Sequence, residues 1–253
     1  MKTEAILTFQ EGYAEILLQP TPQHKPPTID FSLLDQIEHH LSQIEQTPSC
    51  RILFIKSTSS KYFVVGANLE ALKTITTETI PNWIERGHKV FNRIEALPIP
   101  VVAIIEGYAL GGGLEFALSC DLLFASSQAQ LGQPEASLGF IPGWGGCSRL
   151  PERIGYGKAK ELFFTGRIIT AEEAYRIGLV DFVGSKEELQ AKIVSTRESI
   201  LKNSAIAISM IKKILTTRTL ANRPRSELEE ATASVLCLAN GDTARRLQDF
   251  FKK

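Results

Sequence analysis

The stretch Gly107–Asp121 reads GYALGGGLEFALSCD and places three consecutive glycines before an apolar segment that contains one carboxylate, Glu115. The residues that lead into it, VVAIIEG, form an apolar run typical of a buried strand that ends at Gly107. We expect a helix to begin near residues 111–113. Its free N–H groups and the positive end of its dipole would then lie at the carboxyl end of the strand. Such a place can hold a phosphate or stabilise a developing oxyanion.

Two nucleotide-binding motifs are absent from this glycine-rich stretch. A P-loop has Lys and then Ser or Thr after its last glycine, whereas Leu114 and Glu115 follow here. The dinucleotide fingerprint GxGxxG is also missing. An acidic side chain beside the glycines disfavours an anion as the primary ligand. A neutral carbonyl that becomes anionic during a reaction fits the pattern better.

Glu115 has no cationic neighbour at the helical spacings of three and four residues. Those positions are occupied by Gly111, Gly112, Leu118 and Ser119. A desolvated, unpaired carboxylate is costly and responds with a raised pKa, which is what a general acid or base near neutral pH requires. The alternatives are a structural pair with a distant base such as Arg149, or a glutamate that favours a helix start.

A second carboxylate occurs in the stretch LGQPEASLGFIPGWGG, residues 131–146. Glu135 lies there in a loop bounded by glycine and proline, and taken alone it is typical of a solvated loop residue. Together with Glu115 it suggests a pair of carboxylates that transfer protons. Coupled carboxylates share protons, so any pKa values would belong to the pair.

The composition is that of an ordinary globular protein, with 43% hydrophobic and 22% charged residues in a chain of 253. Lys+Arg and Asp+Glu are balanced at 28 each, which indicates neither a nucleic-acid nor an anionic-membrane partner. The four cysteines are far apart, and no His, Cys or carboxylate cluster has metal-ligand spacing. We therefore expect free thiols in a reducing compartment and no metal.

No apolar run approaches the roughly 20 residues needed to span a bilayer, and no N-terminal targeting pattern is visible. We therefore expect a cytoplasmic protein without a membrane partner. The four histidines lie in a predicted loop or on polar helix faces, and we expect them all at the surface. They are His24, His39, His40 and His88.

Short apolar strands alternate with amphipathic helices along the first two thirds of the chain, which predicts an α/β core with a largely parallel, covered sheet. Expected strands cover residues 4–19 (a hairpin turning at 10–12), 51–57, 101–107 and 121–126, with a strand end or loop leading into a helix at 61–72. Expected helices cover residues 31–46, 80–97, 170–178, 185–203, 205–217 and 225–241. From about Thr170 onward the chain reads as mostly helical.

Three long stretches, residues 99–126, 129–155 and 165–183, match in order and spacing the pattern of the crotonase family, the enoyl-CoA hydratases and isomerases. The chain resembles this family strongly from about Ile52 to Val183. The resemblance implies the crotonase (ClpP-like) α/β fold, with repeated ββα turns forming a spiral core. It also implies a division into a core with the active site (1–190) and a C-terminal helical region (191–253). That region would complete a homotrimer or a dimer of trimers and close the site.

The resemblance also implies roles for individual residues. Glu115 and Glu135 occupy the positions of the two catalytic glutamates of the hydratases. The backbone N–H groups of Ala67 and Gly112 match the oxyanion hole, and Gly143 matches the glycine that helps to hold the water. Residues that would contact the CoA or acyl part of the substrate are Val65, Gly66, Asn68, Leu69, Gly111, Trp144, Phe250 and Lys252.

The implied reaction is the reversible hydration of a trans-2-enoyl-CoA to a 3-hydroxyacyl-CoA, with an acyl-CoA as partner and no cofactor beyond the CoA of the substrate. An enoyl-CoA isomerase, or another lyase or decarboxylase of the family, is the alternative within this class. A non-catalytic acyl-CoA-binding subunit is the alternative outside it. Glu115 and Glu135 together favour the hydratase.

Three departures from the family pattern are visible. Asn68 stands where the family usually has Asp, which removes a charge but leaves the N–H donor at Ala67. The segment PPTIDFSLL, residues 26–34, replaces an Asn-Ala-Leu-like segment and bears on the shape of the acyl pocket. Trp144 is bulkier than the residue often found there; it either shortens the acyl site or packs against a helix.

Overall fold

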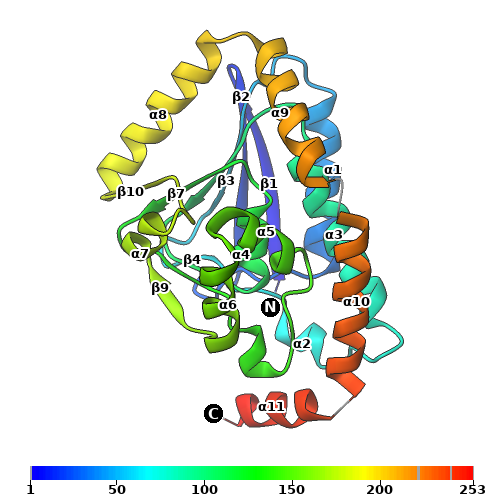
Figure 1. Cartoon of the computed structure of the whole chain (residues 1–253). Coiled ribbons are helices and arrows are strands. Elements are labelled where there is room, and N and C mark those ends of the chain that lie inside the picture. The colour runs from blue at the N-terminus through cyan, green and yellow to red at the C-terminus, as the bar shows by residue number, and fades with distance from the viewer. Residues whose placement is uncertain (1, 221–222, 240, 253) are drawn as a thin grey trace.

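Two β-sheets form the centre of the chain, which the computed structural model describes over residues 2–220, 223–239 and 241–252 (Figure 1). The larger sheet of this part of the chain has the spatial order β1 (Lys2–Gln10), β2 (Tyr13–Thr21), β3 (Leu53–Ser57), β5 (Val101–Ile105), β7 (Leu122–Ser126) and β10 (Phe182–Gly184). The smaller sheet has the order β4 (Tyr62–Val64), β6 (Tyr108–Leu110), β8 (Gln130–Gly132) and β9 (Ile168–Thr170). The hairpin β1–β2 and the pair β8–β9 are antiparallel, and the other pairs are parallel.

Successive strand pairs alternate between the two sheets. β3, β5 and β7 lie side by side in the larger sheet, and each is followed along the chain by a short strand of the smaller one, β4, β6 or β8. Helical segments close these turns, among them α4 (Gly112–Leu118) after β6 and the short 3-10 helix η1 (Glu135–Leu138) after β8. The chain thus has the repeated ββα turns that the family resemblance implies.

The order of elements around the glycine triplet differs from the expectation in one respect. The apolar strand β5 ends at Ile105, and the additional strand β6 lies between it and the helix. Helix α4 therefore starts at the carboxyl end of β6. Its close approach to β4 requires glycine, because a methyl group built on Gly113 would lie 2.0 Å from the carbonyl oxygen of Val64.

The larger sheet is buried on both faces, which explains its nearly continuous apolar strands. Leu53 and Ile55 of β3 point into the main core, whereas Phe54 belongs to a second cluster on the opposite face. Helix α8 (Lys186–Lys202) covers that second face, and it begins with a capping box between Ser185 and Glu188. The expected boundary at residue 190 falls inside this helix.

Six of the remaining helices were expected from the sequence: α1 (Phe31–Glu45), α2 (Leu69–Leu72), α3 (Ile80–Ala96), α7 (Ala171–Arg176), α9 (Ala205–Leu220) and α10 (Arg223–Ala239). Three were not predicted: α5 (Gly146–Ile154), α6 (Tyr156–Thr165) and α11 (Asp242–Phe251). Helix α1 packs on α3 and on β1, and α10 packs along α3 and against α5 (Figure 1). Helix α10 thereby lies beside the loop of residues 143–146, next to the candidate site.

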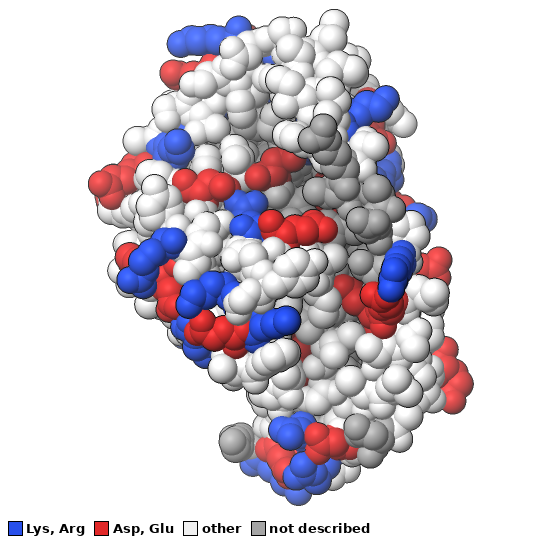
Figure 2. All heavy atoms as spheres, in the orientation of Figure 1, with Lys and Arg blue, Asp and Glu red and all other residues white. Residues whose placement is uncertain are grey.

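The surface carries charges of both signs. On the face drawn in Figure 2, the Lys and Arg atoms are interspersed with Asp and Glu atoms. Many form pairs, such as Arg167 with Glu161 and Glu173. Among the described residues, no helix combines the length and the apolar character needed to cross a bilayer.

Candidate active site

Two backbone amides from different turns border one space. Ala67 lies in the loop between β4 and α2, and Gly112 is the first residue of α4. A methyl group built on Gly112 would lie 3.6 Å from the Ala67 nitrogen. Neither amide donates a hydrogen bond to another described residue. An oxygen atom that accepted from both would be stabilised as it gained negative charge.

The loop that carries Ala67 is fixed by the unusual proline-rich segment. The amides of Val65 and Asn68 donate to the carbonyl oxygens of Pro27 and Ile29, at 3.0 and 2.7 Å. The Asn68 side chain caps α2 by accepting from the Glu70 amide at 3.0 Å. The replacement of the family's usual Asp by Asn therefore retains a cap for the helix that follows Ala67.

Glu115 is buried, with 2% of its surface exposed, and it lines the same space. Its Oε1 atom accepts hydrogen bonds from the amides of Trp144 and Gly146, at 2.7 and 2.8 Å. The expectation of an unpaired carboxylate was therefore wrong in part, because backbone donors hold one oxygen. Its other oxygen, Oε2, accepts no hydrogen bond from the described residues, which leaves it available to a ligand in the cavity.

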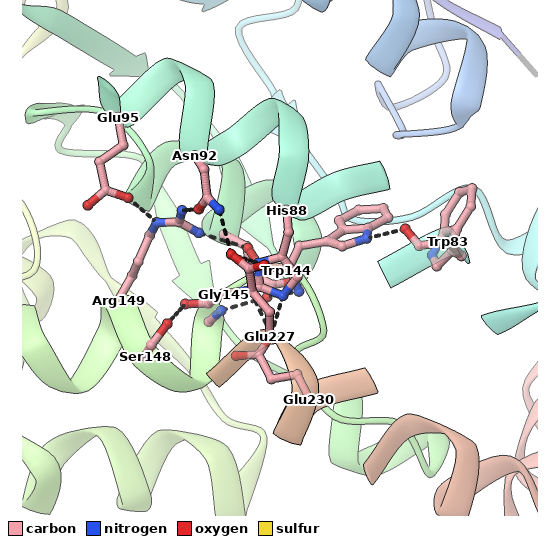
Figure 3. A network of polar contacts seen from close by, with 12 residues as sticks. Trp83, His88, Asn92, Glu95, Trp144, Gly145, Ser148, Arg149, Glu227 and Glu230 are labelled. Atoms are coloured by element: carbon pink, nitrogen blue, oxygen red, sulfur yellow. Dashed lines mark hydrogen bonds and ion pairs between the residues drawn. The ribbon is translucent and has the colours of Figure 1, made fainter. Parts of the chain in front are cut away.

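Arg149, the distant base considered as a partner for Glu115, serves the neighbouring loop. Its guanidinium donates to the carboxylate of Glu95 at 3.0 Å, to the amide oxygen of Asn92 at 2.5 Å and to the carbonyl oxygen of Trp144 at 2.9 Å (Figure 3). The arginine thus stabilises the loop whose amides bind Glu115.

Glu135 is the first residue of η1 and lies against Gly111, where a methyl group would come within 2.8 Å of its Oε1. Gly111 itself has a φ of +53°, a conformation that favours glycine. The buried Gln133 amide, with its nitrogen turned toward Glu135, donates to the two carboxylate oxygens at 2.9 and 3.0 Å. Glu135 therefore faces the cavity in a fixed orientation and is only partly exposed to solvent.

The electrostatic environment raises the pKa of both glutamates. Burial is the main cause for Glu115, the negative charges of Glu135 and Glu230 add to it, and the amides of Gly146 and Trp144 oppose it. Burial likewise raises the pKa of Glu135 to about 8. A carboxyl pair with raised pKa values can hold a proton near neutral pH and exchange it during a reaction.

The cavity that joins these groups encloses about 690 Å³, part of it open to solvent. Its polar end has Glu115, Glu135 and the loop of Ala67, and Gly143 lies in its wall. The remaining wall is apolar and consists of Leu69, Leu72, Ile80, Trp83, Ile84, Leu138, Phe140, Ile141 and Trp144. The arrangement places an acid/base pair and two amide donors beside a space suited to a hydrocarbon chain.

The indole of Trp144 packs against helix α3, which is one of the two alternatives expected, and it also lines the cavity. Its effect on the length of an acyl site stays a prediction. Its Nε1 donates to the carbonyl oxygen of Trp83 at 3.1 Å, and its ring contacts Phe91 edge to face. Gly87 of α3 makes room for it, because a methyl group there would lie 2.2 Å from the indole. The side chain is therefore fixed, and it limits the apolar part of the cavity.

Of the predicted substrate-contacting residues, Val65, Gly66, Leu69, Gly111 and Trp144 line the cavity. The others lie elsewhere. The Asn68 side chain is buried at the start of α2, and Phe250 and Lys252 lie at the end of α11. Their contact with a substrate stays a prediction.

The expectation of a surface position was wrong for His88, which is 2% exposed on α3. Its Nε2 atom lies 2.9 Å from Oε2 of Glu230, a buried residue of α10 (Figure 3). Sequence reasoning missed Glu230 because its partners His88 and Gly145 are distant in the chain. It also missed Gln133, although Glu135 lies only two positions further on.

Among the described residues, no group of three or more His, Cys, Asp or Glu side chains could hold a metal ion. The four cysteines are free thiols. The groups that line the cavity include two carboxylates, which can transfer protons, and two backbone amides that can donate to one oxygen atom.

The fold is that of the crotonase family, and comparisons with known proteins agree. The model of the enoyl-CoA hydratase/isomerase family matches residues 8–243. A crotonyl-CoA hydratase from Syntrophomonas wolfei is 36% identical over 253 residues, and a short-chain-enoyl-CoA hydratase from Clostridium acetobutylicum is 34% identical over the same length. In both cases all of this chain and 97% of the relative are covered.

Solved structures give the same result. The crystal structure of an enoyl-CoA hydratase from Bacillus anthracis superposes with a TM-score of 0.80 and 31% identity, covering 98% of this chain and 96% of that chain. The chain belongs to the enoyl-CoA hydratase/isomerase family, and its full-length similarity to two hydratases supports enoyl-CoA hydratase activity.

Proposed function

We propose that this chain is an enoyl-CoA hydratase that adds water reversibly to short-chain trans-2-enoyl-CoA thioesters, giving 3-hydroxyacyl-CoA. The observation that carries the proposal is the meeting of Glu115 and Glu135, both with raised pKa values, in a cavity that also holds two free amides. An isomerase needs only one acid/base group to move a proton, so a carboxylate pair favours the hydratase.

In the proposed reaction the thioester oxygen accepts hydrogen bonds from the amides of Ala67 and Gly112. These donors stabilise the enolate character that develops as water adds. The water lies between the two carboxyl groups, which share one proton at neutral pH. Gly143, in the cavity wall beside Trp144, contributes to the position of the water.

The step balances without an added reagent. The water oxygen bonds to the β-carbon while the ionised carboxylate takes one of its protons, and the protonated carboxyl gives its own proton to the α-carbon. The carbon–carbon π bond breaks, and the pair of glutamates again holds one proton and one negative charge. No resident cofactor or metal is needed, because substrate and water supply every atom and electron.

The aromatic wall supports a short acyl chain. Trp144 is anchored to the carbonyl of Trp83 and packs on Phe91, so the apolar end of the cavity is closed by rigid side chains. Each additional methylene that the pocket cannot accommodate costs roughly 1–3 kcal/mol in discrimination. The names of the two full-length relatives, a crotonyl-CoA and a short-chain-enoyl-CoA hydratase, agree with this assignment.

The experiment is a substrate panel with purified protein. We expect crotonyl-CoA to lose its enoyl absorbance as water adds, and medium-chain, long-chain and branched enoyl-CoAs to react more slowly. Glu115→Gln and Glu135→Gln are each expected to lower kcat by about 10²- to 10⁴-fold, because each removes one proton-transfer group. Glu198→Gln, an exposed glutamate of α8, is the matched control and keeps full activity.

Three other outcomes would overturn the proposal. If the protein hydrated no enoyl-CoA of any chain length, the hydratase assignment would be wrong. Conversion of a 3-enoyl-CoA to the 2-enoyl isomer without hydration would favour the isomerase. If both glutamine variants still bound acyl-CoA and no reaction were seen with the wild-type protein, the chain would be a non-catalytic acyl-CoA-binding subunit.

We further infer that the C-terminal helical region, residues 191–253, mediates assembly into a homotrimer or a dimer of trimers. Exposed apolar side chains on α9 and α10 support this: Ile206, Ile211, Ile214, Leu215, Leu228 and Leu236. In such an assembly Phe250 and Lys252, at the end of α11, would close over the CoA of an adjacent subunit.

A further inference from the structure

Three consecutive backbone amides of the Gly143–Gly146 loop are divided between two buried carboxylates. The amides of Trp144 and Gly146 donate to Oε1 of Glu115, at 2.7 and 2.8 Å. The amide between them, that of Gly145, donates instead to Oε2 of Glu230 at 2.9 Å. The loop is thus held both by Glu115 and by Glu230 of α10, and Figure 3 shows Glu230 beside Gly145.

A single peptide unit of this loop is fixed at both ends. The carbonyl oxygen of Trp144 accepts from Arg149 at 2.9 Å, and the N–H of Gly145, which belongs to the same planar unit, donates to Glu230. The peptide therefore cannot rotate without breaking one of the two bonds. Because the Trp144 and Gly146 amides flank this unit, its orientation determines whether they point at Glu115.

The buried position of Glu230 is unfavourable for the stability of the folded protein. It is 3% exposed, and its Oε1 atom is buried without a hydrogen-bond partner in the described structure. Its Oε2 atom also contacts Nε2 of His88 at 2.9 Å, while Nδ1 of His88 is buried, unpaired and 4.0 Å from Glu227. Burying a carboxylate with one unsatisfied oxygen is unfavourable, so packing alone does not account for a glutamate here.

The residues that surround Glu230 and Arg149 come from separate elements. Glu227, one turn before Glu230 on α10, accepts from the side-chain amide of Asn92 at 2.6 Å, and Asn92 in turn accepts from Arg149. Glu95 completes the set by pairing with Arg149. The network thus links α3, α5 and α10 around the loop of residues 143–146 (Figure 3).

We propose that Glu230 is a positioning residue for the hydration reaction: by holding the Trp144–Gly145 peptide, it directs the two flanking amides onto Glu115 and places a fixed negative charge behind it. The inference rests on the proposed catalytic role of Glu115. Glu230 does not line the cavity, so it acts through the loop and does not touch the substrate.

The charge of Glu230 has a second, measurable consequence. It contributes to the raised pKa of Glu115, after burial and the charge of Glu135. The other titratable or charged described side chains that face the two glutamates are His88 on α3, Cys147 and Arg149 on α5, and Glu227 on α10. Neutralising Glu230 should therefore lower the pKa of Glu115 and extend activity to lower pH.

Two variants separate the effect of the Glu230 charge from the effect of its hydrogen bond with the Gly145 amide. Glu230→Gln keeps the shape and an oxygen that can accept from Gly145, and we expect the acidic limb of the kcat/KM profile for crotonyl-CoA to shift to lower pH. Glu230→Ala removes the acceptor, and we expect kcat to fall about 10- to 100-fold with KM changed less than threefold, because the catalytic group is misplaced while the cavity persists. Glu229→Gln and Glu229→Ala, at an exposed neighbouring position of α10, are the matched controls.

A readout independent of catalysis completes the test. Hydrogen–deuterium exchange of peptides covering residues 143–149 should be faster in Glu230→Ala than in the wild type, and unchanged in Glu229→Ala. An unaltered pH limb together with unaltered exchange and kcat would overturn the proposal. The proposal would also be overturned if the fall in kcat of Glu230→Ala were fully explained by a lower melting temperature. Absence of hydration by the wild type would contradict the proposed function, and the exchange rates alone would then decide whether Glu230 holds the loop.

Discussion

At the scale of single residues, the site depends on a balance of opposed effects on Glu115. Burial and the charges of Glu135 and Glu230 favour its protonated form, whereas two backbone N–H donors favour the ionised form. A carboxyl group that was only buried would remain protonated and could not act as a base. The amide donors therefore hold the group in position and also keep its ionised form accessible.

The raised pKa of Glu135 predicts a pH-dependent gain in stability when it is replaced by Gln. Its pKa is about 8 in the folded protein against 4.5 for an unburied glutamate. The folded state therefore disfavours ionisation, so the contribution of this group to stability is greatest below pH 4.5 and is lost as the pH rises toward 8. Glu135→Gln cannot ionise and avoids this loss.

We expect the melting temperature of Glu135→Gln to equal that of the wild type near pH 5 and to exceed it at pH 8.5. The gain should be on the order of 1 kcal/mol, or about 2–4 °C, because the side chain is partly solvated and shares its proton with Glu115. Differential scanning calorimetry at both pH values measures the difference. A gain of equal size at the two pH values, or the same trend in Glu198→Gln, would contradict this explanation.

The sequence predicted the two glutamates but not the groups that orient them. Glu115 and Glu135 are recognisable locally, because each lies beside glycines in a setting that is unusual for a carboxylate. Glu230 and His88 are 142 positions apart, and each occupies a polar position of an amphipathic helix pattern. Only the packing of α10 on α3 brings them together, and periodicity within one helix contains no information on its neighbours.

At the scale of elements, long periodic segments were predicted and three-residue strands were not. Helices α1, α3 and α8 have enough turns to display an apolar face, and β3, β5 and β7 are continuous apolar runs. β6 and β8 have three residues each and are stabilised by pairing with each other, so they lack a pattern of their own. Because β6 was not predicted, α4 was expected to follow β5 directly.

A buried ion pair links helix α9 to the core, which predicts a sharp difference between two adjacent lysines. Nζ of Lys212 lies 2.6 Å from Asp121 and 2.9 Å from the carbonyl oxygen of Ile99, and Asp121 also accepts from the Val101 amide. Removing the cation leaves a largely buried carboxylate and carbonyl without their donor.

We expect Lys212→Met to lower the free energy of unfolding by on the order of 2–3 kcal/mol, measured by urea titration. Lys213→Met, at an exposed position one residue further on, should change it by less than about 0.5 kcal/mol. Equal effects of the two substitutions would show that the ion pair does not attach α9 to the sheet.

At the scale of the whole molecule, the two sheets and the N-terminal helices form a closed core, whereas the C-terminal helices do not cover their own apolar side chains. Ile211, Ile214 and Leu215 of α9 are each more than half exposed, at 58%, 59% and 59%. On α10, Leu228 and Leu236 are 70% and 66% exposed. Apolar groups gathered in this way on adjoining helices are typical of surfaces that pack against another subunit.

The proposed assembly can be tested by light scattering coupled to size-exclusion chromatography. We expect a mass of three or six times the 28.0 kDa of the chain. Ile214→Asp, which places a charge on the exposed apolar face of α9, should shift the protein toward smaller species, because burying an unpaired carboxylate in an interface is costly. Ile214→Leu keeps the apolar surface and serves as control. A wild-type monomer, or an unchanged mass for Ile214→Asp, would mean that this face of α9 is not a subunit interface. If the wild type were a monomer, Phe250 and Lys252 of a neighbouring subunit could not close the site.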